Sequence, residues 1–259
     1  MTCHNCRIDA PKHGKHRNGL QRFRCSQCSK TFTEPHPEAF RVEMYLEDPR
    51  GILALQMLTE GNSIRSVERM TGLHRNIVMQ ILVIAGERCE ELLAREVRNV
   101  PVADVQCDEI WGFVQKKESN RHSYEEGYQE IGDAWCFVAF ERNTKMVLTY
   151  ELGKRNMDYT MRFLRKLSFA TSPDNRFQLS TDGFRAYPTA VARTLGNRVD
   201  FAQLIKIYAA PMESERRYSP PIVVDTVRKP IFGNPDMERI CTSHVERQNL
   251  TMRMQISRG

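Results

Sequence analysis

The sequence predicts an α/β fold with a mixed sheet for residues 100–259, preceded by two smaller modules. Four of the eight cysteines fall within the first 28 residues, and apolar positions at helical spacing follow in residues 40–97. From residue 100 onwards, strand-like and helix-like segments alternate. A length of 259 residues suits one larger domain with one or two small ones. We therefore expect domains at 1–34, 40–97 and 100–259.

The first module contains two C-x2-C pairs. Cys3 with Cys6 and Cys25 with Cys28 are separated by eighteen residues. Each pair directs two thiolates at one point, and two pairs complete a tetrahedral four-thiolate zinc site. So short a segment cannot bury enough apolar surface to fold alone, and zinc binding would supply the missing free energy. The spacing predicts a structural zinc ribbon that includes a strand at 20–24; redox-active thiols are the alternative.

The excess positive charge is confined to the same module. Residues 1–33 contain seven Lys/Arg and one Asp, whereas the remaining 226 residues (259 − 33) contain 31 basic (38 − 7) and 31 acidic (32 − 1) side chains. A local excess of positive charge is typical of a surface that contacts nucleic-acid phosphates, and a solvated charged surface is the alternative. Arg22 and Arg24 are the candidate DNA contacts here.

Residues 63–81 have the pattern of a helix-turn-helix. Ser63 can cap a first helix, Gly72 permits the turn, and a second helix follows with Ile77, Val78 and Ile81 facing inward. Arginine and amide side chains on such a second helix can read base edges in the major groove. The candidate DNA-contacting residues of the second helix are His74, Arg75, Asn76 and Gln80. The alternative is a helical hairpin that serves as a spacer.

The third domain should contain the mixed sheet. The segments expected as strands are 102–107, 110–114, 134–140, 146–150, 176–180 and 202–208. Helices are expected at 156–169, at 184–195 and from Ser243, and a proline-rich loop at 209–240. We expect the first three strands to pair antiparallel and the rest to alternate with helices.

Three acidic residues lie where this sheet would bring them together. Asp108 and Asp182 each follow a predicted strand, and the carboxyl ends of strands line the ligand crevice of an open α/β sheet. Glu246 lies in the first turn of the last predicted helix. Three converging carboxylates suit two Mg²⁺ or Mn²⁺ ions about 3.5–4 Å apart that act on a phosphodiester. Taken singly, the acids could instead serve as a strand-end cap, a turn residue and a favourable helix N-terminal charge.

The residues around these acids are more specific. They are DEIW at 108–111, TDGF at 181–184 and VERQN at 245–249. These segments resemble the three catalytic blocks of the insertion sequence one family of DDE transposases, in which a zinc ribbon and a helix-turn-helix precede the core in the same order. The resemblance implies a ribonuclease-H-like core with Asp108, Asp182 and Glu246 as metal-binding acids. It also places Asn249 and Arg253 in the signature that follows the glutamate.

The resemblance further implies a function. The two N-terminal modules would bind double-stranded DNA at the terminal inverted repeats of an insertion sequence. The core would cut the strand ends and join them to target DNA, with structural Zn²⁺, catalytic Mg²⁺ or Mn²⁺, and a homodimer or higher oligomer on DNA. A zinc-ribbon DNA-binding regulator and a nuclease or junction resolvase of the same fold are the alternatives.

Two further expectations concern the ends of the chain and its location. The chain stops thirteen residues after Glu246, where family members continue the last helix into another basic segment. We therefore expect a C-terminal truncation, and an inactive transposase that only binds DNA is a further alternative. The absence of a long apolar run and of a signal-peptide pattern leads us to expect a cytoplasmic, nucleoid-associated prokaryotic protein.

Overall fold

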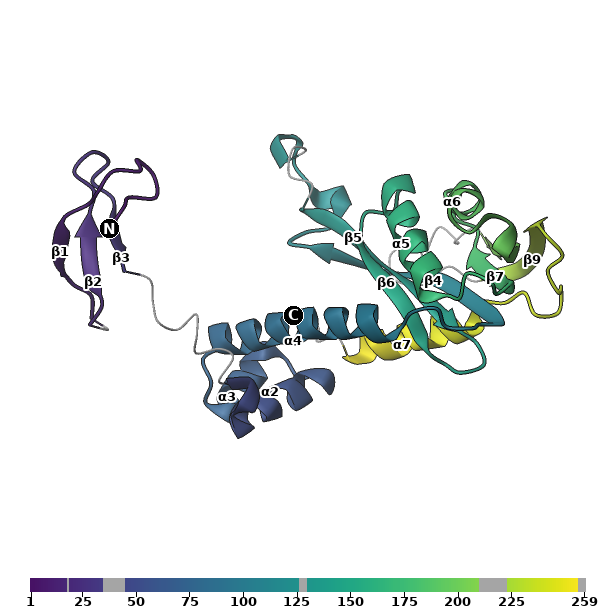
Figure 1. The fold of residues 1–259 in the computed structure, drawn as a ribbon, viewed down its shortest axis with the longest axis horizontal. Coiled ribbons are helices and arrows are strands. Elements are labelled where there is room, and N and C mark those ends of the chain that lie inside the picture. The colour runs from purple at the N-terminus through teal and green to yellow at the C-terminus, as the bar shows by residue number, and fades with distance from the viewer. Residues whose placement is uncertain (18, 35–44, 126–129, 210–222, 256–259) are drawn as a thin grey trace. The chain divides into compact units, whose positions relative to one another are not determined.

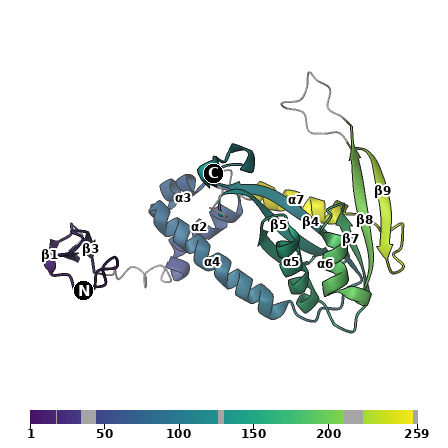
Figure 2. The ribbon, with the colours of Figure 1, turned by 90° about the horizontal axis from the view of Figure 1, so that it is seen from above.

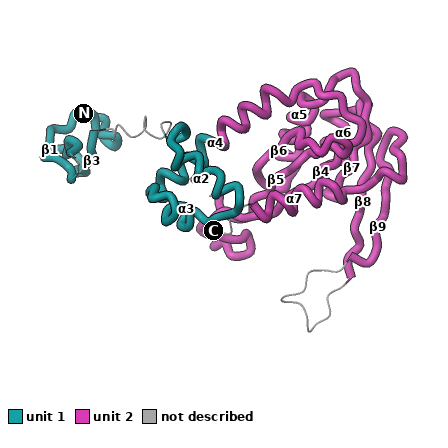
Figure 3. The backbone as a smooth tube through the Cα atoms, turned by 90° about the horizontal axis from the view of Figure 1, so that it is seen from below, with its two compact units in different colours: residues 1–85, 259 teal, residues 86–258 magenta. Residues whose placement is uncertain are grey.

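The computed structural model describes residues 1–17, 19–34, 45–125, 130–209 and 223–255. The chain divides into two compact units, residues 1–85 and 86–258 (Figure 3). Among the described residues, no helix combines the length and the apolar character that crossing a membrane requires.

The N-terminal residues form a three-stranded antiparallel sheet in the order β1-β2-β3 (Figure 1). Its strands are β1 (Lys12–Lys15), β2 (Gln21–Arg24) and β3 (Thr31–Thr33). The central strand β2 confirms the strand predicted from the alternation at 20–24. Its Phe23 is buried and stacks on its cross-strand partner Phe32, with 5.9 Å between ring centroids. Because side chains alternate along a strand, Arg22 and Arg24 lie on the opposite face.

The helices α2 (Pro49–Thr59), α3 (Ile64–Thr71) and α4 (Arg75–Glu96) follow. The predicted cap and turn of α3 are confirmed: the Ser63 hydroxyl accepts a hydrogen bond from the Ser66 N–H, and Gly72 ends the helix with a φ of 71°. The three helices share a small apolar core of Ala54, Leu58, Val67, Leu73, Val78 and Ile81. Pro35 and Pro37 indicate a linker between the first two modules, and residues 35–44 lie outside the described residues.

The second unit is built on a six-stranded mixed sheet in the order β6-β5-β4-β7-β8-β9. Its strands are β4 (Asp104–Val114), β5 (Gly132–Glu141), β6 (Val147–Gly153), β7 (Phe177–Asp182), β8 (Val199–Tyr208) and β9 (Val223–Phe232). β4, β5 and β6 pair antiparallel, β7 runs parallel to both β4 and β8, and β9 is antiparallel to β8. The predicted mixed α/β sheet is confirmed, but its three antiparallel strands are not the first three predicted segments, because the third is β6, which was expected as the fourth segment at 146–150.

Helices cover both faces of this sheet (Figures 1 and 2). They are α5 (Met157–Ala170), α6 (Tyr187–Thr194) and α7 (Ser243–Gln255), with short 3-10 turns η2 (Glu118–Asn120), η3 (Ser123–Glu125) and η4 (Gly196–Arg198). On one face, Phe163 of α5 and Tyr187 of α6 are buried against strand residues such as Leu179. On the other face, Val245 of α7 packs against Ile110 and Val138.

Two predictions about the strands are wrong. Segments 102–107 and 110–114 belong to one strand, β4, because pairing with β5 continues without a break from Val105 to Val114. The segment 209–240, predicted as a loop, contains β9. Pro230 weighed against a strand there, but β9 is an edge strand whose register shifts beside Ala202, the partner of Pro230, and proline is tolerated at such positions.

Candidate metal centres

The two C-x2-C segments fold into the same local structure. In the first, Cys3 N–H donates to the carbonyl of Ile8 and Arg7 N–H donates to the carbonyl of Cys3, both at 2.8 Å. Cys25 forms the equivalent pair of bonds with Lys30 and Ser29, both at 3.0 Å. Arg7 and Ser29, each directly after the second cysteine of its pair, have positive φ angles of 55° and 57°. Each segment therefore turns tightly and directs its two thiols inward.

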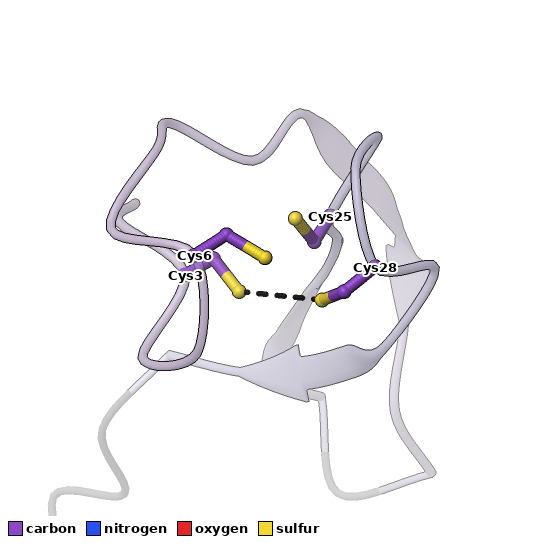
Figure 4. A group of neighbouring side chains, drawn as sticks. All are labelled: Cys3, Cys6, Cys25 and Cys28. Atoms are coloured by element: carbon purple, nitrogen blue, oxygen red, sulfur yellow. Dashed lines mark hydrogen bonds between the residues drawn. The ribbon is translucent and has the colours of Figure 1, made fainter.

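The four thiols meet between the two turns (Figure 4). Their sulfur atoms all lie within 4.8 Å of one another, and Cys3 Sγ is 3.7 Å from Cys28 Sγ. Tetrahedral zinc with Zn–S bonds of about 2.3 Å separates its sulfurs by about 3.8 Å. A hydrogen bond with Cys28 and burial raise the pKa of Cys6 to about 12, and the neighbouring Cys25 acts in the same direction. The geometry of the donors fits a zinc ion.

The predicted DNA-contacting residues lie at the surface. Arg24 is exposed on β2 and Arg22 is partly exposed beside it. The candidate contacts in the first turns of α4 and just before its start are also exposed: His74, Arg75, Asn76 and Gln80. Two hydrogen bonds from backbone N–H groups to side chains hold the first turn of α4. Arg75 N–H donates to Glu68 Oε1 at 3.0 Å, and Asn76 N–H donates to His74 Nδ1 at 3.2 Å. The side chains of Glu68 and His74 therefore cap the helix. The guanidinium of Arg75 takes no part in these two bonds.

In the second unit, the sheet brings two of the predicted acids together. Asp108 is in the middle of β4, not at its end as predicted. The parallel pairing between β4 and β7 nevertheless stops at Cys107 and Thr181, one residue before each aspartate. Asp108 and Asp182 therefore both lie where the parallel part of the sheet ends, and both line one open cleft with a volume of about 520 Å³.

A third carboxylate of this cluster was not predicted. Oxygen atoms of Asp108, Glu109 and Asp182 lie within 4.8 Å of one another. Glu109 is buried on the α5 and α6 side of the sheet, where it accepts a hydrogen bond from the Tyr187 hydroxyl. Arg155 bridges two of the acids: its Nε donates to Glu109 Oε2 at 3.1 Å and its Nη2 donates to Asp182 Oδ2 at 2.7 Å.

Glu246 reaches the same cleft from α7. It lines the cleft with Asp108 and Asp182, and its Oε1 lies 2.7 Å from Lys206 Nζ on β8. The Thr242 hydroxyl also donates to Glu246. Among the described residues, Glu246 is not within the tight group formed by Asp108, Glu109 and Asp182. The cleft is therefore lined by two members of the acidic cluster, Asp108 and Asp182, and by a glutamate outside that cluster that is paired with a lysine.

Of the two other residues in the predicted signature, one contacts the acids. Asn249 is only 3% exposed, and its Nδ2 donates to Asp108 Oδ2 at 2.9 Å. Arg253, two turns from Glu246, is exposed and is not among the residues that line the cleft. The structure thus places Asn249 beside Asp108, while Arg253 stays outside the cleft.

The surroundings of Asp108 and Glu109 oppose the ionisation of these two acids. Burial, and then the charges of Asp182 and Glu246, raise the pKa of Asp108 to about 6. Burial and the charge of Asp182 raise the pKa of Glu109 to about 7, although Tyr187 and Arg155 act in the opposite direction. A cation beside these oxygens would reverse the repulsion. Clustered carboxylate oxygens are the ligands that Mg²⁺ and Mn²⁺ prefer, and the residues present fit such an ion.

Comparisons with known proteins leave the family open. The sequence matches no family model and no curated protein. Solved structures that match include a piggyBac transposase in a synaptic complex with hairpin DNA, at 11% identity and a TM-score of 0.37 over 69% of this chain and 44% of that one. An endonuclease V from Bacillus subtilis matches at 12% identity and a TM-score of 0.23, over 53% of this chain and 58% of that one. The chain thus spans less than two thirds of either protein.

Proposed function

We propose that this protein is a DDE transposase, with a ribonuclease-H-like core that cuts and joins DNA strands. The observation that carries the proposal is the convergence of Asp108, Asp182 and Glu246 from β4, β7 and α7 on one open cleft. These residues are separated by 74 (182 − 108) and 64 (246 − 182) positions in the sequence. A regulator that only binds DNA has no need of clustered carboxylates held against their own repulsion at the edge of a sheet.

The proposed reaction has two steps. Water attacks a phosphorus at the end of the element, and the bond to the 3′-oxygen breaks to leave a 3′-hydroxyl. That hydroxyl then attacks a target phosphorus and displaces another 3′-oxygen, so no covalent protein intermediate is required. Two bound Mg²⁺ or Mn²⁺ ions would supply activation of the attacking oxygen and stabilisation of the leaving oxygen.

The residues of the chain position these groups. Asp108, Asp182 and Glu246 would hold the ions, with Glu109 as an additional carboxylate beside Asp108 and Asp182. Asn249 fixes the Asp108 carboxylate through its hydrogen bond of 2.9 Å. Because Asp108 is partly buried, this bond would help to orient its carboxylate toward a bound ion.

The N-terminal residues would recognise the DNA. Cys3, Cys6, Cys25 and Cys28 would hold a structural zinc, and the basic surface around Arg22 and Arg24 would contact phosphates. α4 would enter the major groove with His74, Arg75, Asn76 and Gln80 as candidate base contacts. Because two ends of an element must be brought together for joining, a homodimer or higher oligomer on DNA is part of the proposal.

The test is strand cleavage and strand joining on labelled duplexes taken from the ends that flank the reading frame, with and without Mg²⁺. Asp108→Asn, Asp182→Asn and Glu246→Gln should each abolish both reactions while DNA binding persists. Asp158→Asn, which removes a 67% exposed acid on α5, is the matched control and should retain activity.

The products separate the alternatives. Joined products support a transposase, and cleavage without joining on any target supports a nuclease of the same fold. Binding of the end sequences with no cleavage under any metal supports a DNA-binding regulator or an inactive transposase, and the catalytic proposal is then wrong.

A further inference from the structure

The acids of the cleft are already paired with cations of the chain itself. Arg155 donates to both Glu109 and Asp182, and Lys206 contacts Glu246. The oxygens that Arg155 occupies, Glu109 Oε2 and Asp182 Oδ2, belong to two of the three carboxylates that could hold an ion. A guanidinium and a divalent cation would therefore compete for the same lone pairs.

The position of Arg155 is fixed by more than these two carboxylates. Its guanidinium lies over the ring of Phe184, 4.1 Å from the centroid, and within 5.0 Å of the centroid of Trp135. Phe184 follows β7 and Trp135 belongs to β5, so two separate strands hold the group at the edge of the cleft. A planar guanidinium on aromatic faces with two carboxylate partners is a defined arrangement, unlike a mobile surface pair.

Resting on the proposed function, we propose that Arg155 is the counter-ion of the acidic cluster in the metal-free protein and couples metal loading to DNA binding. Glu109 and Asp182 would release the guanidinium in order to hold a divalent cation, both because the oxygens are shared and because like charges repel. Arg155 lines the open cleft, so the phosphates of bound DNA are the anions that can receive it there. Metal and DNA then each favour the binding of the other.

This coupling has a measurable consequence. Reciprocity requires that if DNA tightens metal binding through Arg155, metal tightens DNA binding by the same factor. Without the guanidinium, the acids should bind metal more readily in the absence of DNA. We expect Arg155→Gln to bind Mn²⁺ about tenfold more tightly than the wild type without DNA, from the loss of one nearby positive charge. The additional tightening caused by DNA should shrink in the same variant.

The experiment is calorimetric titration of Mn²⁺ into the full chain, with its zinc left in place, with and without duplex DNA. Arg155→Lys keeps a positive charge but cannot bridge both carboxylates, so its affinity should lie between those of the wild type and Arg155→Gln. Arg162→Gln removes an exposed arginine of α5 that pairs with Asp158, and it should behave as the wild type. Arg155→Lys also provides the test if Arg155→Gln does not fold.

The outcomes separate this inference from the proposed function. If Mn²⁺ binds the wild type and binds the Arg155 variants no more tightly, Arg155 only clamps the carboxylates and the coupling is wrong, while the metal site stands. If neither the wild type nor any variant binds Mn²⁺, or if Asp182→Asn leaves Mn²⁺ binding unchanged, both the coupling and the proposed catalytic site are wrong. Titration needs no turnover, so neither result depends on strand cleavage.

Discussion

Replacing Asp108 by Asn should stabilise the second unit when no divalent cation is bound to the acids. In the metal-free protein, the pKa of Asp108 rises from its ordinary 3.8 to about 6, first because the carboxylate is buried and then because Asp182 and Glu246 repel it. A carboxylate with a raised pKa in the folded state weakens folding as the pH rises through the interval from 3.8 to about 6. An amide at the same position carries no charge to desolvate.

The magnitude follows from that shift. A difference of 2.2 units (6 − 3.8), at about 1.4 kcal/mol per unit, gives an upper bound of about 3 kcal/mol above pH 7. This bound already includes the hydrogen bond from Asn249, which lowers the pKa of Asp108. A gain of up to about 3 kcal/mol should raise the melting temperature of the second unit by up to about 12 °C, at roughly 2–4 °C per kcal/mol for a domain of this size.

The assay is differential scanning calorimetry between pH 4 and pH 8, in buffer without added Mg²⁺ or Mn²⁺. Asp108→Asn should melt above the wild type at pH 8, and the difference should disappear near pH 4, where Asp108 is protonated. Mg²⁺ should then raise the melting temperature of the wild type and not that of the variant. Asp158→Asn, the exposed control, should match the wild type throughout. A variant that melts below the wild type at every pH would refute the account of the site as a group of mutually repelling acids.

Three further predictions concern the N-terminal residues. Metal analysis should find one tightly bound zinc per chain, and Cys25→Ser should lose it without changing the melting of the second unit; zinc-free protein that keeps its N-terminal fold contradicts this. Removal of residues 1–33 should weaken DNA binding. It should also reduce the slope of log affinity against log salt concentration by about 0.9 for each phosphate that the shortened protein no longer neutralises. An unchanged slope would contradict this prediction. Arg75→Ala should cost about 1–3 kcal/mol on cognate DNA and little on scrambled DNA in binding titrations, whereas equal losses on both would assign Arg75 to the backbone.

The sequence predicted those parts of the fold that local patterns control. The Ser63 cap and the Gly72 turn were predictable because each depends on a few adjacent residues. The break between segments 102–107 and 110–114 was a false prediction, since polar residues in a strand do not end it when a neighbouring strand pairs with it throughout. β9 escaped prediction because its eight exposed residues from Val223 to Pro230 lack the burial that produces alternation.

The candidate site was predictable only in part for the same reason. Asp108, Asp182 and Glu246 stood out because each follows or begins an element with a recognisable pattern. Glu109 was not predicted, because the strand was expected to end at this point. Since β4 continues, Glu109 and its neighbour Asp108 point to opposite faces of the sheet. Arg155 lies between β6 and α5, in a segment with no pattern, and its role depends on Glu109 and Asp182, which are distant in sequence.

β4 is the element on which the geometry of the cleft depends most. Gln106 of β4 is fully buried, and its side-chain carbonyl accepts hydrogen bonds from the backbone N–H groups of His244 at 3.1 Å and Val245 at 3.2 Å, which open α7. Two residues further on, Asp108 faces the same side and receives Asn249 from the next turns of α7. One strand, β4, therefore both fixes the start of α7 and presents Asp108 to it. Gln106 does not line the cleft, yet it helps to set the distance between Asp108 and Glu246 because it holds the start of α7.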